Sequence, residues 1–200
     1  MKLGVLASGA GTNLQAILDT VHGRDGIEVT AVASDRPDAQ ALERAREAGV
    51  ATEVFPATGY PDREARDSAM ARWLAGQREV ELVVLAGYMQ LLNGSFLRDF
   101  PDRVINVHPA LLPAFPGLDA IGQAVAYGVK VFGVTVHFVD EGVDSGPIIL
   151  QKSVEIPDAT DPEAVHDRLR PIEHELLTAA IRLIAQGAVS IEGRRVRLDR

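Results

Sequence analysis

Short apolar segments alternate with helix-like segments through the first half of this sequence. The apolar runs cover residues 3–7, 28–34, 51–55, 82–86 and 104–108. Between them, apolar residues recur at helical spacing over 13–21, 39–48, 62–74 and 96–100. Strands that are apolar on both faces and alternate with helices are typical of a parallel sheet covered on both sides. The pattern predicts an α/β fold with an open, mostly parallel, twisted sheet and helices on both faces.

The pattern changes after residue 108. Residues 131–140 and 147–156 are strand-like and are joined by only 141–146, a link too short for a parallel crossover. We therefore expect antiparallel strands near the C-terminal end. A long helix over 161–186 should kink at Pro171, and a hairpin should follow over 189–198. We find no repeat and no linker, and we expect a single domain over 1–200.

Composition excludes several classes of function. The longest apolar runs fall short of the roughly 18–20 residues of a membrane span, and the short apolar N-terminus does not have the form of a signal peptide. The formal charge of -8 disfavours nucleic acid as a partner. The chain has no cysteine, and its five histidines lack zinc-ligand spacing, so we expect no metal. A cytoplasmic location is the expectation.

A glycine loop, Ser8-Gly9-Ala10-Gly11-Thr12-Asn13, lies between the first strand and the first helix. Backbone N–H groups at such a helix start can bind an anion, because glycine lets a ligand approach closely. The loop could hold one phosphate, or it could be a tight turn in which Thr12 caps the helix. Leu14 stands where dinucleotide-binding loops have a third glycine, which weakens a dehydrogenase interpretation. Asp35, placed where a dehydrogenase binds ribose, keeps that interpretation open.

The strand at 104–108 ends in two polar side chains, Asn106 and His108, and leads into the proline-rich loop 109–117. Side chains two apart on a strand share a face, and ligands bind at the carboxyl ends of parallel strands. An amide and a protonated imidazole together can stabilise negative charge that develops on a carbonyl oxygen. The alternative is a satisfied strand end, in which His108 merely bonds a backbone carbonyl.

The link between the last two long strands carries three carboxylates, those of Asp140, Glu141 and Asp144. A carboxylate near an imidazole raises the pKa of the imidazole and keeps it a proton donor at neutral pH. The alternative is an ordinary acidic turn.

Five segments together carry a resemblance to a known family. They are GAGTN at 9–13, LAGYMQLL at 85–92, NVHPALLPAFPG at 106–117, GVTVHFVDEGVDSGPIILQ at 133–151 and IEHELL at 172–177. In this order and spacing they resemble the glycinamide ribonucleotide transformylases, folate-dependent formyltransferases with a Rossmann-like fold. The resemblance implies formyl transfer from 10-formyltetrahydrofolate to the amine of glycinamide ribonucleotide in purine biosynthesis. It also implies a nucleotide-binding half at 1–100, a catalytic and folate-binding half at 101–200, and a monomer or homodimer.

The resemblance assigns roles to individual positions. Asn106 and His108 are expected to be catalytic, and Asp144 to raise the pKa of His108. The positions expected to bind glycinamide ribonucleotide are Gly11, Thr12, Asn13, Arg170, Pro171, Ile172 and Glu173. The positions expected to bind the folate are Arg63, Met89, Gln90, Leu91, Leu92, Asn106, Asp140, Glu141, Gly142, Val143 and Asp144. Arg63 would meet the glutamate tail of the folate.

Two positions qualify the resemblance. Gln90 stands where arginine often occurs, which puts a charged contact there in doubt, and His137 is expected to be structural. Another folate-dependent formyltransferase or a folate deformylase would share Asn106, His108 and Asp144. A nucleotide-binding oxidoreductase would explain the glycine loop and Asp35, but not these three residues.

Overall fold

The computed structural model describes residues 1–199, and the chain divides into two compact units. The division falls inside strand β5 (Val104–His108): the first unit comprises Met1–Asn106 and the second begins at Val107. Each unit is built around its own group of strands. That residues 1–200 form a single domain stays a prediction.

The first unit contains a parallel sheet with the strand order β3-β2-β1-β4-β5. Besides β5, its strands are β1 (Lys2–Leu6), β2 (Glu28–Ser34), β3 (Ala51–Val54) and β4 (Leu82–Leu85). Every residue of β4 is buried, as expected for a strand covered on both faces. The predicted fold class, a mostly parallel sheet within an α/β architecture, is confirmed.

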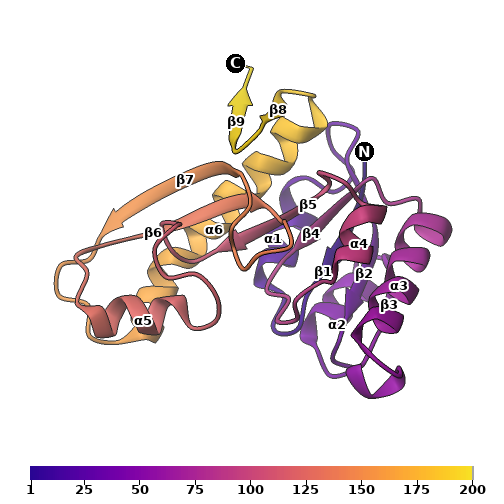
Figure 1. Cartoon of the computed structure of the whole chain (residues 1–200), viewed down its shortest axis with the longest axis horizontal. Coiled ribbons are helices and arrows are strands. Elements are labelled where there is room, and N and C mark those ends of the chain that lie inside the picture. The colour runs from indigo at the N-terminus through magenta and orange to yellow at the C-terminus, as the bar shows by residue number, and fades with distance from the viewer. Residues whose placement is uncertain (200) are drawn as a thin grey trace. The chain divides into compact units, whose positions relative to one another are not determined.

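Helices connect these parallel strands. They are α1 (Thr12–Thr20), α2 (Gln40–Glu47), α3 (Arg63–Arg72) and α4 (Gly94–Asp99), with a 3₁₀ turn η1 (Ala57–Gly59) and a π-helical turn η2 (Trp73–Gln77). Connections between parallel strands are right-handed. The chain runs from β1 to β2 and β3 in one direction along the sheet, which puts α1 and α2 on one face. It then runs to β4 and β5 in the other direction, which puts α3 and α4 on the opposite face. α1 contacts α2, and α3 contacts α4 (Figure 1).

The strand order reverses between β1 and β4, so the chain leaves these two neighbours in opposite directions. Ligands of open α/β sheets bind at such a point. The Ser8 N–H donates to the Gly87 carbonyl oxygen at 3.0 Å. This bond joins the glycine loop after β1 to the segment after β4, and both segments were predicted to bind substrates.

The second unit is built on antiparallel strands. β6 (Val131–Phe138) pairs antiparallel with β7 (Ile148–Glu155), and β8 (Val189–Glu192) forms a hairpin with β9 (Arg195–Leu198). The long helix α6 (Pro162–Ala185) packs on β6 and β7, and α5 (Ala120–Tyr127) packs against α6 (Figure 1). The antiparallel strands near the C-terminal end are as predicted. Over residues 1–199, no helix is long and apolar enough to cross a membrane.

Two elements differ from the sequence-based expectation. Helix α5 was not predicted, because its sequence AIGQAVAY has almost no polar residues to mark an outer face. The helix expected over 62–74 ends at Arg72 and continues as the π turn η2, where Trp73 packs edge-on against Phe55 with ring centroids 5.9 Å apart. α6 continues through Pro171, and the expected kink there stays a prediction.

Gly11 has a structural role at the start of α1. It is the residue before the helix and has φ +73°, a left-handed conformation that favours glycine. A Cβ at this position would lie 2.7 Å from Cα of Ala41 in α2. Thr12 is the first helical residue, and no side chain caps α1. The interpretation of Thr12 as a helix cap is therefore wrong, and Gly11 is required by the packing of α1 on α2.

Gly11→Ala should destabilise the fold by about 2–5 kcal/mol, because a left-handed alanine costs about 1–2 kcal/mol and overpacking a further ~1–3 kcal/mol. Gly9→Ala is the matched control, since no atom lies within 4 Å of a Cβ built there. The control should change stability by less than about 0.5 kcal/mol. Urea unfolding of the three proteins measures both effects. Equal stabilities for the two variants would contradict the packing argument.

Candidate active site

His108 lies at the end of β5 with only 4% of its surface exposed. Its Nδ1 is 3.3 Å from Oδ2 of Asp144, and its Nε2 is 2.8 Å from the carbonyl oxygen of Phe115. An ionised carboxylate and a carbonyl can only accept hydrogen bonds. The two ring nitrogens of His108 therefore face two different acceptors, the Asp144 carboxylate and the Phe115 carbonyl oxygen. The sequence-based pairing of His108 with Asp144 is thus present as a direct contact.

The Asp144 carboxylate is shared by three donors. Besides His108, the Gly117 N–H donates to Oδ2 at 2.7 Å, and Nε2 of His137 lies 3.5 Å from Oδ1. Burial by itself would raise the pKa of Asp144. The hydrogen bonds from His137 and Gly117 and the charges of the two histidines outweigh burial and lower this pKa. Asp144 is therefore an anion throughout the neutral range.

His137 was expected to be structural, and no sequence pattern connects it with Asp144. It is 1% exposed and lies where the register of β6 against β7 shifts, between Val136 and His137. Such irregularities re-aim a side chain. Its Nδ1 lies 2.8 Å from the Phe138 carbonyl oxygen, and its Nε2 faces Asp144. His137 thus belongs to the same cluster as His108.

The proline-rich loop after β5 is held by two polar side chains of the second unit. Thr135 Oγ1 donates to the Ala110 carbonyl oxygen at 2.7 Å and accepts from the Leu112 N–H at 3.2 Å. Gln151 Nε2 donates to the Leu112 carbonyl oxygen at 2.9 Å and to Thr135 Oγ1 at 3.0 Å. These bonds fix the loop that carries Phe115 and Gly117, and neither Thr135 nor Gln151 was predicted.

Asn106 lies two residues before His108 in the same strand and pairs in register with Leu85 of β4. The two polar side chains therefore share one face of β5. Asn106 is half-buried, as a group that meets a ligand at a strand end would be.

The three carboxylates of the 140–146 turn have three different environments. Oδ1 of Asp140 accepts from the Gly142 N–H at 3.1 Å and from Ser145 Oγ at 2.6 Å, which shapes the turn. Glu141 is exposed, and Asp144 faces the histidines. The side chain of Asp140, one of the positions assigned to the folate, is therefore hydrogen-bonded within the turn. Val143 presents an apolar side chain that is 47% exposed.

The glycine loop is supported from α2 by an arginine that was not predicted. Arg44 Nε donates to the Ala10 carbonyl oxygen at 2.8 Å, and its NH1 donates to Oε1 of Gln15 at 2.9 Å. The residue before α1, Gly11, offers no side-chain cap to the helix. A helix start next to a cation is a favourable place for an anion.

The segment after β4 exposes two of its apolar side chains. Met89 is 59% exposed and Leu91 56% exposed, whereas Gln90 and Leu92 are half-buried. Asp35 accepts hydrogen bonds on both oxygens, from Ser8 Oγ at 2.5 Å and from Gln90 Nε2 at 3.0 Å. Asp35 is thus engaged within the protein, which removes the reason for expecting it to bind ribose.

The predicted nucleotide positions on α6 include one buried acid. Glu173 is 6% exposed, and its Oε1 lies 3.7 Å from Nε2 of His166. Arg170 forms an ion pair with Asp167 at 3.0 Å, Pro171 is exposed and Ile172 is half-buried. Glu173 is thus a buried carboxylate beside His166.

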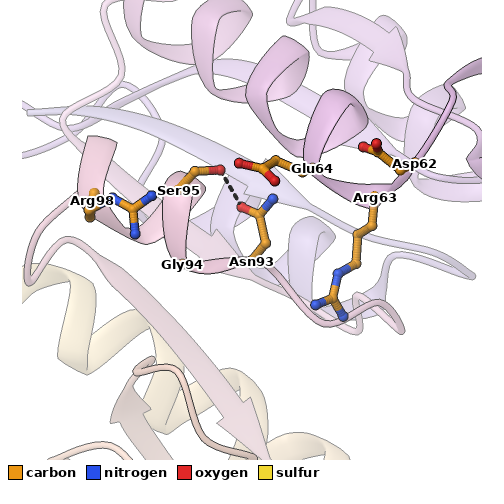
Figure 2. A pocket seen from close by; sticks show the side chains of 7 residues that line it. All are labelled: Asp62, Arg63, Glu64, Asn93, Gly94, Ser95 and Arg98. Carbon is orange, nitrogen blue, oxygen red and sulfur yellow. Dashed lines mark hydrogen bonds between the residues drawn. The ribbon is translucent and has the colours of Figure 1, made fainter.

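Arg63 lines a pocket of about 500 Å³ in the first unit. Figure 2 shows this pocket between the starts of α3 and α4. Its lining residues are Asp62, Arg63, Glu64, Asn93, Gly94, Ser95 and Arg98. The two arginines give it groups that can bind a carboxylate.

The chain is similar over its length to known proteins. A family model described as formyl transferase matches residues 1–181. A phosphoribosylglycinamide formyltransferase of Mycobacterium tuberculosis is 43% identical over 199 residues, covering 100% of this chain and 92% of that relative. The chain belongs to the formyl transferase family.

Solved structures of this family extend the comparison. Glycinamide ribonucleotide transformylase 1 from Symbiobacterium toebii matches with a TM-score of 0.96 at 52% identity, over 99% of this chain and 93% of that one. A formyltetrahydrofolate deformylase from Pseudomonas syringae matches with a TM-score of 0.90 at 27% identity, over 98% of this chain but 65% of the deformylase. Both the sequence identity and the TM-score are higher for the transformylase than for the deformylase.

In this member of the formyl transferase family, the negative charge on Asp144 can be tested through its effect on the stability of the fold. Because the folded state lowers the pKa of Asp144, its ionised form stabilises the fold above the ordinary aspartate pKa of about 3.9. That stabilisation is lost as the pH falls through the lowered pKa. Asp144→Asn should therefore unfold at a lower temperature than the parent protein at pH 7, and the difference should narrow below about pH 4.

Thermal unfolding of both proteins between about pH 3 and pH 8 measures this difference. Glu141→Gln, in the same turn but exposed, is the control and should follow the parent protein at every pH. A difference for Asp144→Asn that stays constant down to pH 3 would contradict the assignment of a stabilising charge to Asp144.

Proposed function

We propose that this chain transfers a formyl group from 10-formyltetrahydrofolate to the amine of glycinamide ribonucleotide, in purine biosynthesis. The observation that carries the proposal is the position of His108, which is held by Asp144 at the end of the strand that also carries Asn106. The similarity to phosphoribosylglycinamide formyltransferases over nearly the whole length supports the choice of reaction.

In this proposal, the nitrogen of the acceptor amine attacks the formyl carbon, and the C=O double bond opens to give an oxyanion. The Asn106 amide and the His108 imidazolium donate hydrogen bonds to that oxygen. The carbonyl then re-forms as the bond between the formyl carbon and the folate nitrogen breaks. The amine loses a proton and the folate nitrogen gains one, which leaves a formamide and tetrahydrofolate.

The contact between His108 and Phe115 sets a requirement for this mechanism. The Nε2–H of His108 is donated to the Phe115 carbonyl oxygen, so the formyl oxygen must replace that carbonyl as the acceptor. Phe115 has φ +53°, a conformation that is unfavourable for a bulky residue. A change in this peptide would release His108 for the substrate and relieve the unfavourable backbone conformation.

For the nucleotide, we propose that Gly11, Thr12 and Asn13 bind the phosphate, and that Glu173 binds the glycinamide end with Arg170, Pro171 and Ile172 beside it. The position of the glycine loop at the start of α1 and its support from Arg44 favour an anion there. The assignment of Glu173 follows the resemblance of the segment 172–177, in which Glu173 is the buried acid.

For the folate, we propose contacts with Met89, Gln90, Leu91, Leu92, Asn106, Asp144 and the segment 140–143. Exposed Met89, Leu91 and Val143 offer apolar surface to its ring system. Arg63 would meet the glutamate tail, which the pocket of about 500 Å³ beside it supports. We also propose a cytoplasmic location and a monomer or homodimer, without a nucleic-acid partner.

A folate deformylase would use the same three residues but give formate. The experiment that tests the proposal therefore measures tetrahydrofolate formation by absorbance, with and without glycinamide ribonucleotide. Folate product that forms only with the acceptor supports transfer. Equal rates without the acceptor would indicate hydrolysis, and oxidation of a nicotinamide cofactor in its place would indicate an oxidoreductase.

If Asn106 serves the oxyanion, Asn106→Ala should lower kcat by about 10²–10³-fold with little change in KM for the folate, because the interaction is made only in the transition state. Steady-state kinetics with both substrates varied measures this. A variant with normal kcat and raised KM would make Asn106 a substrate-binding residue instead.

Formyl transfer should need no metal. Among the described residues 1–199, no group of three His, Asp or Glu side chains could hold a metal ion. Treatment with a strong chelator followed by desalting should leave kcat unchanged. Loss of activity that one divalent ion restores would overturn this prediction.

A further inference from the structure

Asp35 lies just beyond the end of β2 and connects three segments of the first unit. Its Oδ1 accepts from Ser8 Oγ in the glycine loop at 2.5 Å, and its Oδ2 accepts from Gln90 Nε2 at 3.0 Å. Ser8 Oγ in turn accepts from the Met89 N–H at 2.9 Å. One carboxylate thus holds the backbone of Met89 through Ser8, and the side chain of Gln90 directly.

A second carboxylate holds the other end of the same segment. Oδ2 of Asp67 accepts from the Asn93 N–H at 2.9 Å. Oδ1 of Asp67 accepts from Nε and NH2 of Arg66 at 2.9 and 2.8 Å, and both side chains are buried. Removing Asp67 would leave Arg66 buried and unpaired, so only Asp35 can be changed without a large loss of stability.

Between these two anchors, the segment 89–92 exposes Met89 and Leu91 although its backbone is tied down. Two exposed apolar side chains on a tied backbone offer apolar surface to a ligand. The Gln90 amide nitrogen is directed at Asp35, so this side chain is held by the protein.

We infer that Asp35 is a positioning residue for the folate: it sets the conformation of 89–92 through Ser8 and Gln90 and does not itself touch either substrate. The inference rests on the proposed function, because it assumes that 89–92 meet the folate. It assigns the amide nitrogen of Gln90 to this hold, so that Gln90 contacts the folate through its other atoms.

Asp35→Ala should raise KM for the folate on the order of tenfold, since two hydrogen bonds that hold the segment are lost. KM for the nucleotide and kcat should stay within about twofold. Asp35→Asn should recover most of the folate affinity, because the Gln90 amide can turn over and accept from the new amide. Asp38→Asn, an exposed neighbour paired with Arg36 at 3.6 Å, is the control.

Exchanging the carboxylate of Asp35 and the amide of Gln90 distinguishes a positioning role of Asp35 from a general loss of stability. Gln90→Glu places a second carboxylate opposite Asp35 and should raise KM for the folate by at least tenfold. Combining it with Asp35→Asn restores a donor opposite the carboxylate and should reverse most of that loss. Thermal unfolding of each variant should show that all remain folded at the assay temperature.

Calorimetric titration with tetrahydrofolate gives folate affinity without requiring turnover. If the parent protein fails to transfer formyl groups but binds tetrahydrofolate, the proposed function fails while this inference is still tested by the same variants. Asp35→Ala with unchanged tetrahydrofolate affinity, or with equal loss for folate and nucleotide, would overturn it. The inference would also be overturned if Gln90→Glu lowered the folate affinity equally in the parent protein and in the Asp35→Asn variant.

Discussion

The ionised carboxylate of Asp144 is the interaction on which the candidate site depends. It binds His108 from the end of β5, His137 from the register shift in β6, and the Gly117 N–H from the proline-rich loop. Three segments that are distant in sequence therefore meet at one group. Without the negative charge, two histidines and a backbone donor would lose the acceptor that they share.

The arrangement around this carboxylate explains why the loop after β5 is rigid and irregular. Thr135 and Gln151 hold its backbone at Ala110 and Leu112, and this brings the Phe115 carbonyl to the free nitrogen of His108. The same scheme recurs at the end of the parallel sheet, where Asp35 and Asp67 hold the segment 89–92. In both places a carboxylate that is engaged on both oxygens fixes a loop that is proposed to meet substrate.

The parts that could be predicted from sequence have local signatures. Alternating apolar strands and helices predicted the parallel sheet, and the short link at 141–146 predicted the antiparallel pair. Asn106, His108 and Asp144 were identified by their spacing and by resemblance. Sequence reasoning could not predict the roles of Arg44, Thr135 and Gln151 or the contact of His137 with Asp144. Each of these joins segments that are close only in the folded chain. Helix α5 was missed because it lacks a polar face. The glycine at position 11 was attributed to a phosphate, although the close backbone of Ala41 also requires a glycine there.

The central claim is that the cluster around Asp144 performs formyl transfer to an amine. The most direct measurement is a single turnover followed by NMR, with a ¹³C-labelled formyl group on the folate and ¹⁵N in the acceptor amine. The account predicts a ¹³C signal split by ¹⁵N, which reports the new bond, and it predicts that this signal forms far more slowly in Asp144→Ala. Labelled formate with an unmodified acceptor, or a normal rate in the variant, would contradict it.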